Sequence, residues 1–359
     1  MTATQGDSVR DDVLGRLGKV SAARGVEATA RLGELLGGID GDMRAIELAI
    51  DELAATRPRV DGDTPVYAAV RHLLASRGKR LRPMCVALAA RVGTGFTAAA
   101  RDLAVCAELV HAATLLHDDV VDLGDMRRGA ETARAVYGNA ASIFGGDWLL
   151  VEALRRIHAS RVPGVLEQVL AVLAQMLAAE SLQLENRGVV NEDLDAYMRI
   201  VEGKTASLFR WALFAGARAG GLQSDHCRAL ETYGERLGVA FQIVDDLLDV
   251  TGNAEITGKS LFADLREGKM TYPLILAMKK DSTIAPLVRE ATATEDARRE
   301  KEIYAYVGEA IRATGAAEGA KRFAQELSAQ AVAALEPLPP SMAKETLECI
   351  ATELADRSR

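Results

Sequence analysis

The sequence predicts an all-α protein, and three observations carry that prediction. Of the 359 residues 49% are hydrophobic, with Ala, Leu and Val prominent, whereas aromatic residues make up only 4%. Apolar residues recur at helical spacing, and stretches rich in the aromatic and β-branched residues typical of strands are hard to find. No linker rich in Pro, Gly or Ser divides the middle of the chain, so one large helical domain is expected.

Charge, cysteine usage and hydropathy exclude several classes of protein. The formal net charge of −8 argues against general nucleic-acid binding, which needs a basic face. Four scattered cysteines without CxxC spacing make a zinc site or a disulfide framework unexpected and fit a reducing compartment. No apolar run approaches the ~18 residues that span a bilayer, and the N-terminus does not resemble a signal peptide. We therefore expect a soluble, cytoplasmic protein without a transmembrane segment.

The chain divides into three parts. Residues 1–25 are polar and rich in Ala and Gly, so they are expected to form a flexible N-terminal lead. Residues 26–63 form a helical N-terminal extension, interrupted near Gly37-Gly38, whose apolar stripe serves packing. Residues 64–359 form a single domain, which begins with Thr64 and Pro65 as N-cap and first residue of a helix.

Apolar periodicity and capping residues give the later helices. They are expected, in order, over residues 83–92, 101–122, 145–157, 165–186, 202–209, 233–250 and 316–335. Gly145, Gly146 and Asp147 are expected to introduce the third of these, and Ser341 to cap a last helix that runs through Leu354.

Two acidic clusters carry the chemistry. Residues 115–129 read LLHDDVVDLGDMRRG and contain Asp118, Asp119 and Asp122, followed by the pair Arg127 and Arg128. Residues 241–249 read FQIVDDLLD and repeat the spacing with Asp245, Asp246 and Asp249. Carboxylates held so close in apolar helices are costly unless a cation lies between them, and Mg²⁺ prefers oxygen ligands while leaving room for a substrate phosphate. The clusters indicate a magnesium-diphosphate site.

A basic turn, SRGKRLRP at residues 76–83, joins two of the expected helices. Its four cations lie beside the N-terminus of the following helix, where free N–H groups favour anions. Taken alone, it is more often a solvated basic turn than a binding site. Together with the two acidic clusters, it indicates a second anion site.

These motifs, in this order from about Pro65 onward, resemble the trans-prenyl diphosphate synthases of the polyprenyl synthetase family. The resemblance implies a large bundle of antiparallel helices around a central cavity, with residues 64–359 as the catalytic domain. It implies head-to-tail condensation of isopentenyl diphosphate onto an allylic diphosphate, up to three Mg²⁺ ions between the aspartate clusters, and a homodimer. Peripheral membrane contact can accompany product release.

The resemblance assigns residues one by one. The family's basic motif and histidine place isopentenyl diphosphate on Lys79, Arg82, Arg128 and His111. The allylic diphosphate is assigned to Arg127, Lys204, Thr205 and Lys259, and Gln242 is a further substrate-binding residue. The catalytic residues are Asp118, Asp122, Lys204, Asp245 and Lys259. The chain departs from the family pattern at Arg77 and Phe262, where Gly is common.

Product length is predicted from the helix that carries Asp118. A growing chain passes Thr114 and Ala113, four and five residues earlier, and residues 99–116 contain no Phe, Tyr or Trp to close the path. Short-chain relatives typically have an aromatic residue there, so the chain resembles the long-chain branch that makes hexaprenyl to decaprenyl diphosphates for quinone side chains. A floor from another helix, near Trp148 or across a dimer interface, is then needed.

Four alternatives remain beside this interpretation. One is a short-chain farnesyl or geranylgeranyl diphosphate synthase, and another is a non-catalytic subunit of a heterodimeric synthase, although such subunits typically lose one acidic cluster. A class I terpene cyclase would have a different second metal motif and no need of the basic turn. A purely structural bundle would not need Lys204, Gln242 and Asp246 in apolar helices.

Overall fold

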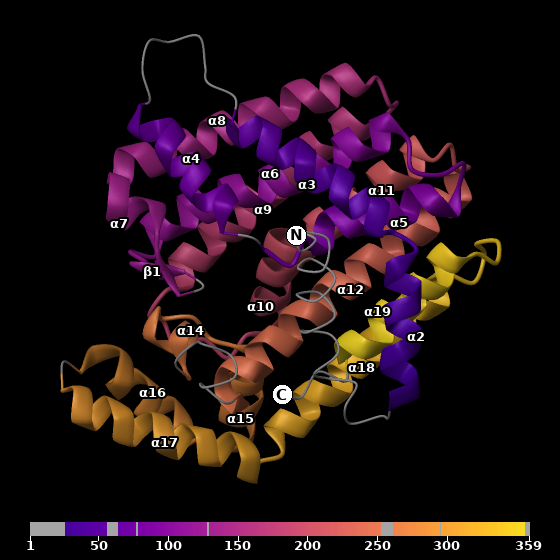
Figure 1. Cartoon of the computed structure of the whole chain (residues 1–359). Coiled ribbons are helices and arrows are strands. Elements are labelled where there is room, and N and C mark those ends of the chain that lie inside the picture. Colours follow the sequence, from indigo (N-terminus) through magenta and orange to yellow (C-terminus); the bar gives the residue numbers. More distant parts are fainter. Residues whose placement is uncertain are drawn as a thin grey trace.

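A computed structural model of the chain describes residues 26–55, 64–76, 78–127, 129–252, 261–294 and 296–355. Almost all of this part is helical, so the all-α prediction is confirmed (Figure 1). The described strands are a short antiparallel hairpin, β1 (Met126–Arg127) with β2 (Ala130–Glu131). The predicted N-terminal lead, residues 1–25, lies outside the described residues.

The helices follow one another with short connections. In chain order they are α2 (Val26–Gly37), α3 (Asp40–Ala55), α4 (Pro65–Ala75), α5 (Leu81–Val92), α6 (Ala98–Val121), α7 (Ala133–Tyr137), α8 (Asn139–Ser160), α9 (Val165–Asn186), α10 (Leu194–Val201), the π-helix η1 (Glu202–Ala206), α11 (Ser207–Ala219), α12 (Ser224–Thr251), α14 (Ala263–Arg266), α15 (Tyr272–Lys280), α16 (Ile284–Ala293), α17 (Ala297–Ala313), α18 (Ala316–Ala334) and α19 (Met342–Ala355).

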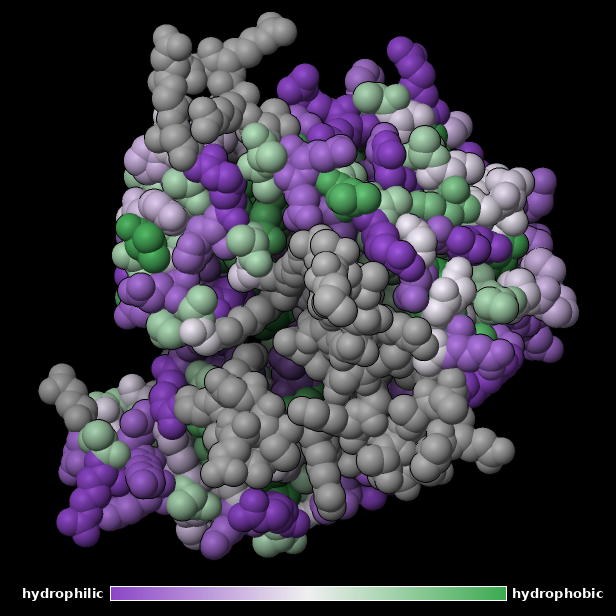
Figure 2. All heavy atoms as spheres, viewed as in Figure 1, coloured by the Kyte–Doolittle hydropathy of each residue, from purple (hydrophilic) through white to green (hydrophobic). Residues whose placement is uncertain are grey.

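The core is built around α6. Every side chain from Leu103 to Val110 is buried, including Glu108, so α6 is covered on all sides over these two turns. Helices α5, α8 and α11 pack against it, and α12 packs on α11. In Figure 1, α6, α8 and α11 lie in the upper part and α12 runs diagonally through the centre, while α16 and α17 make a hairpin at the lower left. Figure 2 shows that this hairpin is mostly hydrophilic and that a notch separates it from the body on the left.

Several predicted helix starts differ from the structure; the helix predicted from residue 233, for example, begins at Ser224 as α12. Helix α8 begins at Asn139, so Gly145 and Gly146 lie inside it. A Cβ on Gly146 would come within 2.3 Å of the His117 ring, so glycine here permits close packing against α6 rather than starting a helix. Asp147 caps nothing, and its carboxylate lies 3.3 Å from His117 Nε2. Helix α5 begins at Leu81, two residues before Pro83.

The apolar stripe of α3 and the cap of the last helix match the prediction. The stripe of apolar residues on α3 is buried: Met43, Ile46, Ile50 and Leu53. The Ser341 hydroxyl accepts a hydrogen bond from the Lys344 N–H at 3.1 Å, as expected of an N-cap at the start of α19.

Helix α9 differs from the prediction in another respect. It is the one described helix long and apolar enough to cross a membrane, although no such run was expected. Much of its hydropathy comes from exposed leucines at seven-residue intervals, Leu170, Leu177 and Leu184, while its other face packs on the bundle.

Candidate active site

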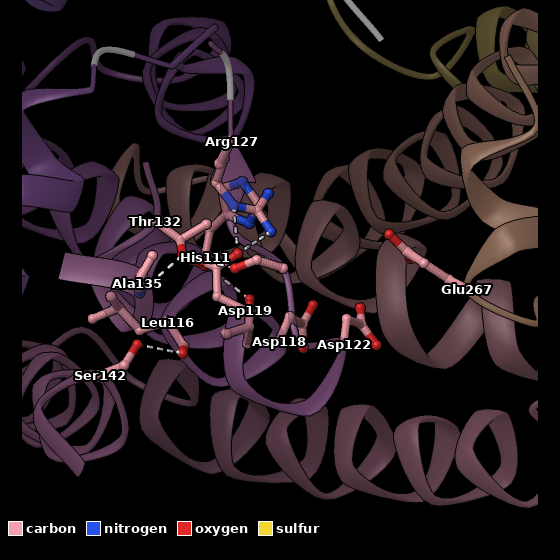
Figure 3. Close-up of polar contacts among 12 residues, drawn as sticks. His111, Leu116, Asp118, Asp119, Asp122, Arg127, Thr132, Ala135, Ser142 and Glu267 are labelled. Atoms are coloured by element: carbon pink, nitrogen blue, oxygen red, sulfur yellow. Dashed lines mark hydrogen bonds and ion pairs between the residues drawn. The ribbon is translucent and has the colours of Figure 1, made fainter. Parts of the chain in front are cut away.

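The two acidic clusters occupy the ends of α6 and α12. Asp118 lies in the last turn of α6 and Asp122 caps it, and both carboxylates are half-buried. Figure 3 shows Asp118 and Asp122 side by side, whereas Asp119 turns toward Arg127. On α12, Asp245 is half-buried and Asp246 is fully buried. Within each cluster, the helical period therefore separates accessible carboxylates from buried ones.

Asp119 is held by the hairpin. Its Oδ1 accepts a hydrogen bond from Arg127 Nε at 2.9 Å, and Arg127 Nη2 forms an ion pair with the same oxygen at 2.8 Å. Burial raises the pKa of the Asp119 carboxyl, and the Arg127 guanidinium offsets part of that rise. The contact fixes the hairpin on the end of α6.

Asp246 is held more completely. Its Oδ2 accepts from the Tyr197 hydroxyl at 2.6 Å and from the Tyr272 N–H at 3.0 Å, and its Oδ1 accepts from Gln242 Nε2 at 2.8 Å. Burial, reinforced by the negative charge of Asp264, raises the pKa of Asp246 to about 7. Because both carboxylate oxygens of Asp246 accept hydrogen bonds, this residue holds Tyr197, Gln242 and Tyr272 in position.

Asp249 connects α12 to α14. Its Oδ1 accepts from the Ala263 N–H at 3.0 Å, and its carbonyl oxygen accepts from the Phe262 N–H at 3.0 Å. Phe262 adopts a left-handed conformation with φ of 61°, which accounts for the preference for Gly at this position. Stacking of its ring on Tyr304, 5.2 Å between centroids, holds it there.

Cations already surround the accessible carboxylates of α6. Lys204 Nζ lies 2.5 Å from Glu180 Oε1 and 3.4 Å from Asp118 Oδ2. Lys269 Nζ lies 2.9 Å from Asp122 Oδ2, and Arg187 bonds to the other oxygen of Asp122. In this arrangement, lysine and arginine groups balance the charge of the first cluster.

A π-helical turn links the two clusters. Lys204 contacts Asp118, and the next residue, Thr205, donates from its hydroxyl to Gln242 Oε1 at 3.0 Å. Gln242 in turn holds Asp246. Lys204 and Thr205 lie in η1, and π-turns often mark functional sites because they redirect side chains within a helix. The clusters, far apart in the sequence, therefore belong to one site.

The basic turn faces the same helices. Lys79 Nζ lies 5.8 Å from the centre of the Phe241 ring, and Arg82 Cζ lies 4.6 Å from that of Phe209. The two rings pack together with centroids 5.7 Å apart. Burial lowers the pKa of Arg82 to about 10, and the Glu108 carboxylate opposes the shift, so Arg82 is charged at neutral pH.

The fate of the remaining predicted residues varies. His111 is half-buried on α6, two turns before Asp118, as predicted. Arg128 and Lys259, and the departure at Arg77, lie outside the described residues. Sequence reasoning did not single out Tyr197 or Arg187, and no motif marks either, because their contacts cross between distant helices.

The donor set fits a hard divalent cation. Asp118, Asp122 and Asp245 present carboxylate oxygens of the type that Mg²⁺ prefers. Asp119 Oδ2 is buried without a hydrogen-bond partner. No three or more His, Cys, Asp or Glu side chains of the described residues gather closely enough to hold a metal.

The chain-length positions differ in environment. Thr114, one turn before Asp118 on the same face, is half-buried, and its hydroxyl donates to the His111 carbonyl oxygen at 2.8 Å. Ala113 is 2% exposed, and its carbonyl oxygen faces Gly146 of α8. Trp148 packs edge-on against Tyr67 with centroids 5.5 Å apart. Of the two positions, Thr114 is the one aligned with the accessible carboxylates.

Comparisons with known proteins agree with this geometry. The family profile described as Polyprenyl synthetase matches residues 63–308. Octaprenyl diphosphate synthase from Escherichia coli is 38% identical over 290 residues, which cover 80% of this chain and 88% of that protein. The crystal structure of a decaprenyl diphosphate synthase from Rhodobacter capsulatus superposes with a TM-score of 0.82 at 32% identity, covering 91% of this chain and 99% of that one.

A second solved structure is similar to the same degree. It is a polyprenyl synthase from Caulobacter crescentus complexed with calcium and isoprenyl diphosphate, with a TM-score of 0.82 and 32% identity over 91% of this chain and 98% of that one.

Proposed function

The chain belongs to the polyprenyl synthetase family and is a long-chain trans-prenyl diphosphate synthase, and from this premise we propose how its residues divide the reaction. Asp118, Asp122 and Asp245 bind Mg²⁺, up to three ions per site. Asp119, Asp246 and Asp249, which the sequence pattern also suggested as metal ligands, orient the metal-binding residues. The observation that carries this division is burial: Asp119 and Asp246 are buried and hydrogen-bonded to neighbouring side chains, whereas Asp118, Asp122 and Asp245 are half-buried.

The ions, when bound, neutralise the diphosphate that leaves the allylic substrate. Lys204 leaves its contact with Asp118 for a diphosphate oxygen and remains beside Glu180. Arg127 and Lys259 add fixed positive charge to the same group, as the family motif implies. Since ionisation of the allylic C–O bond builds charge on the diphosphate, cations fixed there stabilise the transition state more than the ground state.

Isopentenyl diphosphate binds at the basic turn. Lys79 and Arg82 project together over Phe241 and Phe209, so a diphosphate between them would lie next to the helix that carries Asp245. His111 and Arg128 complete this second site by family resemblance. Holding the double bond toward the allylic carbon is catalysis by positioning. The released diphosphate accepts the final proton, because no side-chain base is evident.

We also propose a homodimer through α8 and α9. The exposed apolar residues of α9 recur every seven positions, and α8, which packs beside it, exposes Phe144 and Val151 at the same interval. Such stripes are self-complementary in a two-fold interface between copies. Four cysteines without disulfides among the described residues fit a cytoplasmic location, and peripheral membrane contact during product release remains part of the proposal.

The two diphosphate sites can be separated by steady-state kinetics. Lys79→Ala is expected to raise KM for isopentenyl diphosphate about ten-fold or more, with KM for the allylic substrate nearly unchanged. Lys204→Ala should raise KM for the allylic substrate and lower kcat, because the Lys204 side chain contacts the diphosphate leaving group. If each variant affected the other substrate, the two sites would be exchanged.

A further inference from the structure

Arg80 lies between the two proposed ligands of isopentenyl diphosphate but points away from them. Its side chain is 4% exposed. Nε lies 2.7 Å from Glu47 Oε1 and Nη2 lies 3.3 Å from Glu47 Oε2, while Nη1 lies 2.5 Å from Glu108 Oε1. Glu47 belongs to α3 and Glu108 to α6, so one guanidinium ties the basic turn to two helices.

The backbone at Arg80 needs this support. Its φ of 49° and ψ of 32° place it in the left-handed region, which a non-glycine residue rarely adopts. Arg80 is also the N-cap of α5, and its side chain makes no capping hydrogen bond. The turn sends Arg80 to one side of the chain and leaves Lys79 and Arg82 over the aromatic rings on another.

The charges of Arg80, Glu47 and Glu108 are complementary. Glu47 and Glu108 supply two negative charges, and Arg80 supplies one positive charge. The carboxylates outweigh burial and raise the pKa of the Arg80 guanidinium. Glu108 also acts on Arg82, whose guanidinium would otherwise be disfavoured by burial. The buried Arg80, the half-buried Arg82 and the two buried glutamates therefore balance in charge, which is the condition for keeping such charges inside a protein.

We propose that Glu47 and Arg80 are positioning residues for the isopentenyl diphosphate site, and that α3 serves catalysis by presenting Glu47 to the basic turn. Helix α3 lies outside the 63–308 segment that the family profile matches. The N-terminal extension thereby acquires a function that its sequence did not reveal. The inference rests on the proposed roles of Lys79 and Arg82.

A matched pair of variants on α3 tests the inference. Asp42 on the same helix pairs with Arg91 at the far end of α5, so Asp42→Asn weakens the attachment of α3 without touching the basic turn. Glu47→Gln removes one charge and preserves shape, which makes it gentler than Arg80→Ala. Both Glu47→Gln and Asp42→Asn are expected to lower the melting temperature of the full-length protein.

Only Glu47→Gln should alter substrate binding. We expect KM for isopentenyl diphosphate to rise about three- to ten-fold, with KM for the allylic substrate and kcat within about two-fold of wild type. Calorimetric titration with isopentenyl diphosphate alone should show the same loss of affinity. Asp42→Asn should leave both quantities unchanged.

Two results would overturn the proposal. An unchanged KM and affinity for isopentenyl diphosphate in Glu47→Gln would make the cluster purely structural. An equal rise in Asp42→Asn would mean that loosening α3 anywhere has the same effect. Lys79→Ala, measured alongside, separates these failures from a wrong site assignment: if it also leaves KM for isopentenyl diphosphate unchanged, the basic turn is not the site.

Discussion

Neighbouring aspartates of the first cluster should fail in different ways when altered. Asp119 is buried and paired with Arg127, whose side chain is 30% exposed. Breaking a buried ion pair typically costs 3–5 kcal/mol, and the partial exposure of Arg127 reduces the expected loss for Asp119→Asn to about 2–3 kcal/mol. Asp118 is 21% exposed, and its partner Lys204 would still have an ion pair with Glu180. Asp118→Asn should therefore lower the free energy of unfolding by under about 1 kcal/mol.

Activity should show the opposite ranking. Asp118→Asn removes a metal-binding oxygen and should lower turnover by about 10³-fold or more, with a higher Mg²⁺ requirement. Asp119→Asn should keep a Mg²⁺ dependence close to that of wild type at temperatures where it is folded. Urea unfolding gives the first quantity and product formation at varied Mg²⁺ the second. A fully stable Asp119→Asn with a large shift in Mg²⁺ dependence would refute the division of roles.

Two further predictions concern α12 and the proposed interface. Burial raises the pKa of Asp246 to about 7, above its value in the unfolded chain. Protonation of Asp246 therefore stabilises the folded state fully below the unfolded pKa, and this stabilisation is lost as pH rises toward about 7. Urea unfolding of the metal-free protein should therefore show stability falling over this range, and Asp246→Asn should flatten the dependence; an identical slope in the variant would contradict the assignment. Leu177 is 70% exposed on α9, so Leu177→Asp should convert a dimer into monomers in light scattering, whereas a monomeric wild type or a dimeric variant would place the interface elsewhere.

The aspartate spacing predicted the helices that carry the two clusters, because a period of 3.6 residues is a local property. The expectation that the clusters share a site came from their pairing and from the family resemblance. It could not rank the aspartates within a cluster. Asp119 and Asp246 are distinguished by Arg127, Tyr197 and Tyr272, which approach from other segments. Only the packed structure supplies those partners.

The roles of Gly145, Gly146 and Arg80 also depend on residues from other segments, so the sequence pattern alone did not predict them. Gly145 and Gly146 resemble the start of a helix, but Gly146 packs against the His117 ring and the α6 backbone, and Gly145 packs against Leu116 of α6 and Val70 of α4. Arg80 belongs to a run of four cations that suggests a single function for all of them. Its left-handed backbone and its two glutamates give it a different one.

The length of the product is the most direct test of whether this protein is a long-chain synthase with an open path along α6. The wild type is incubated with isopentenyl diphosphate, a short allylic primer and Mg²⁺, and the dephosphorylated products are separated by chromatography beside those of Thr114→Phe and Ala113→Phe. An open path along α6 predicts all-trans hexaprenyl to decaprenyl products for the wild type. Thr114→Phe, which faces the Asp118 side, should shorten them to about farnesyl or geranylgeranyl length, and Ala113→Phe should shorten them too, although its buried position makes it less stable. A wild type that stops at geranylgeranyl diphosphate, or aromatic variants with an unchanged product distribution, would contradict it.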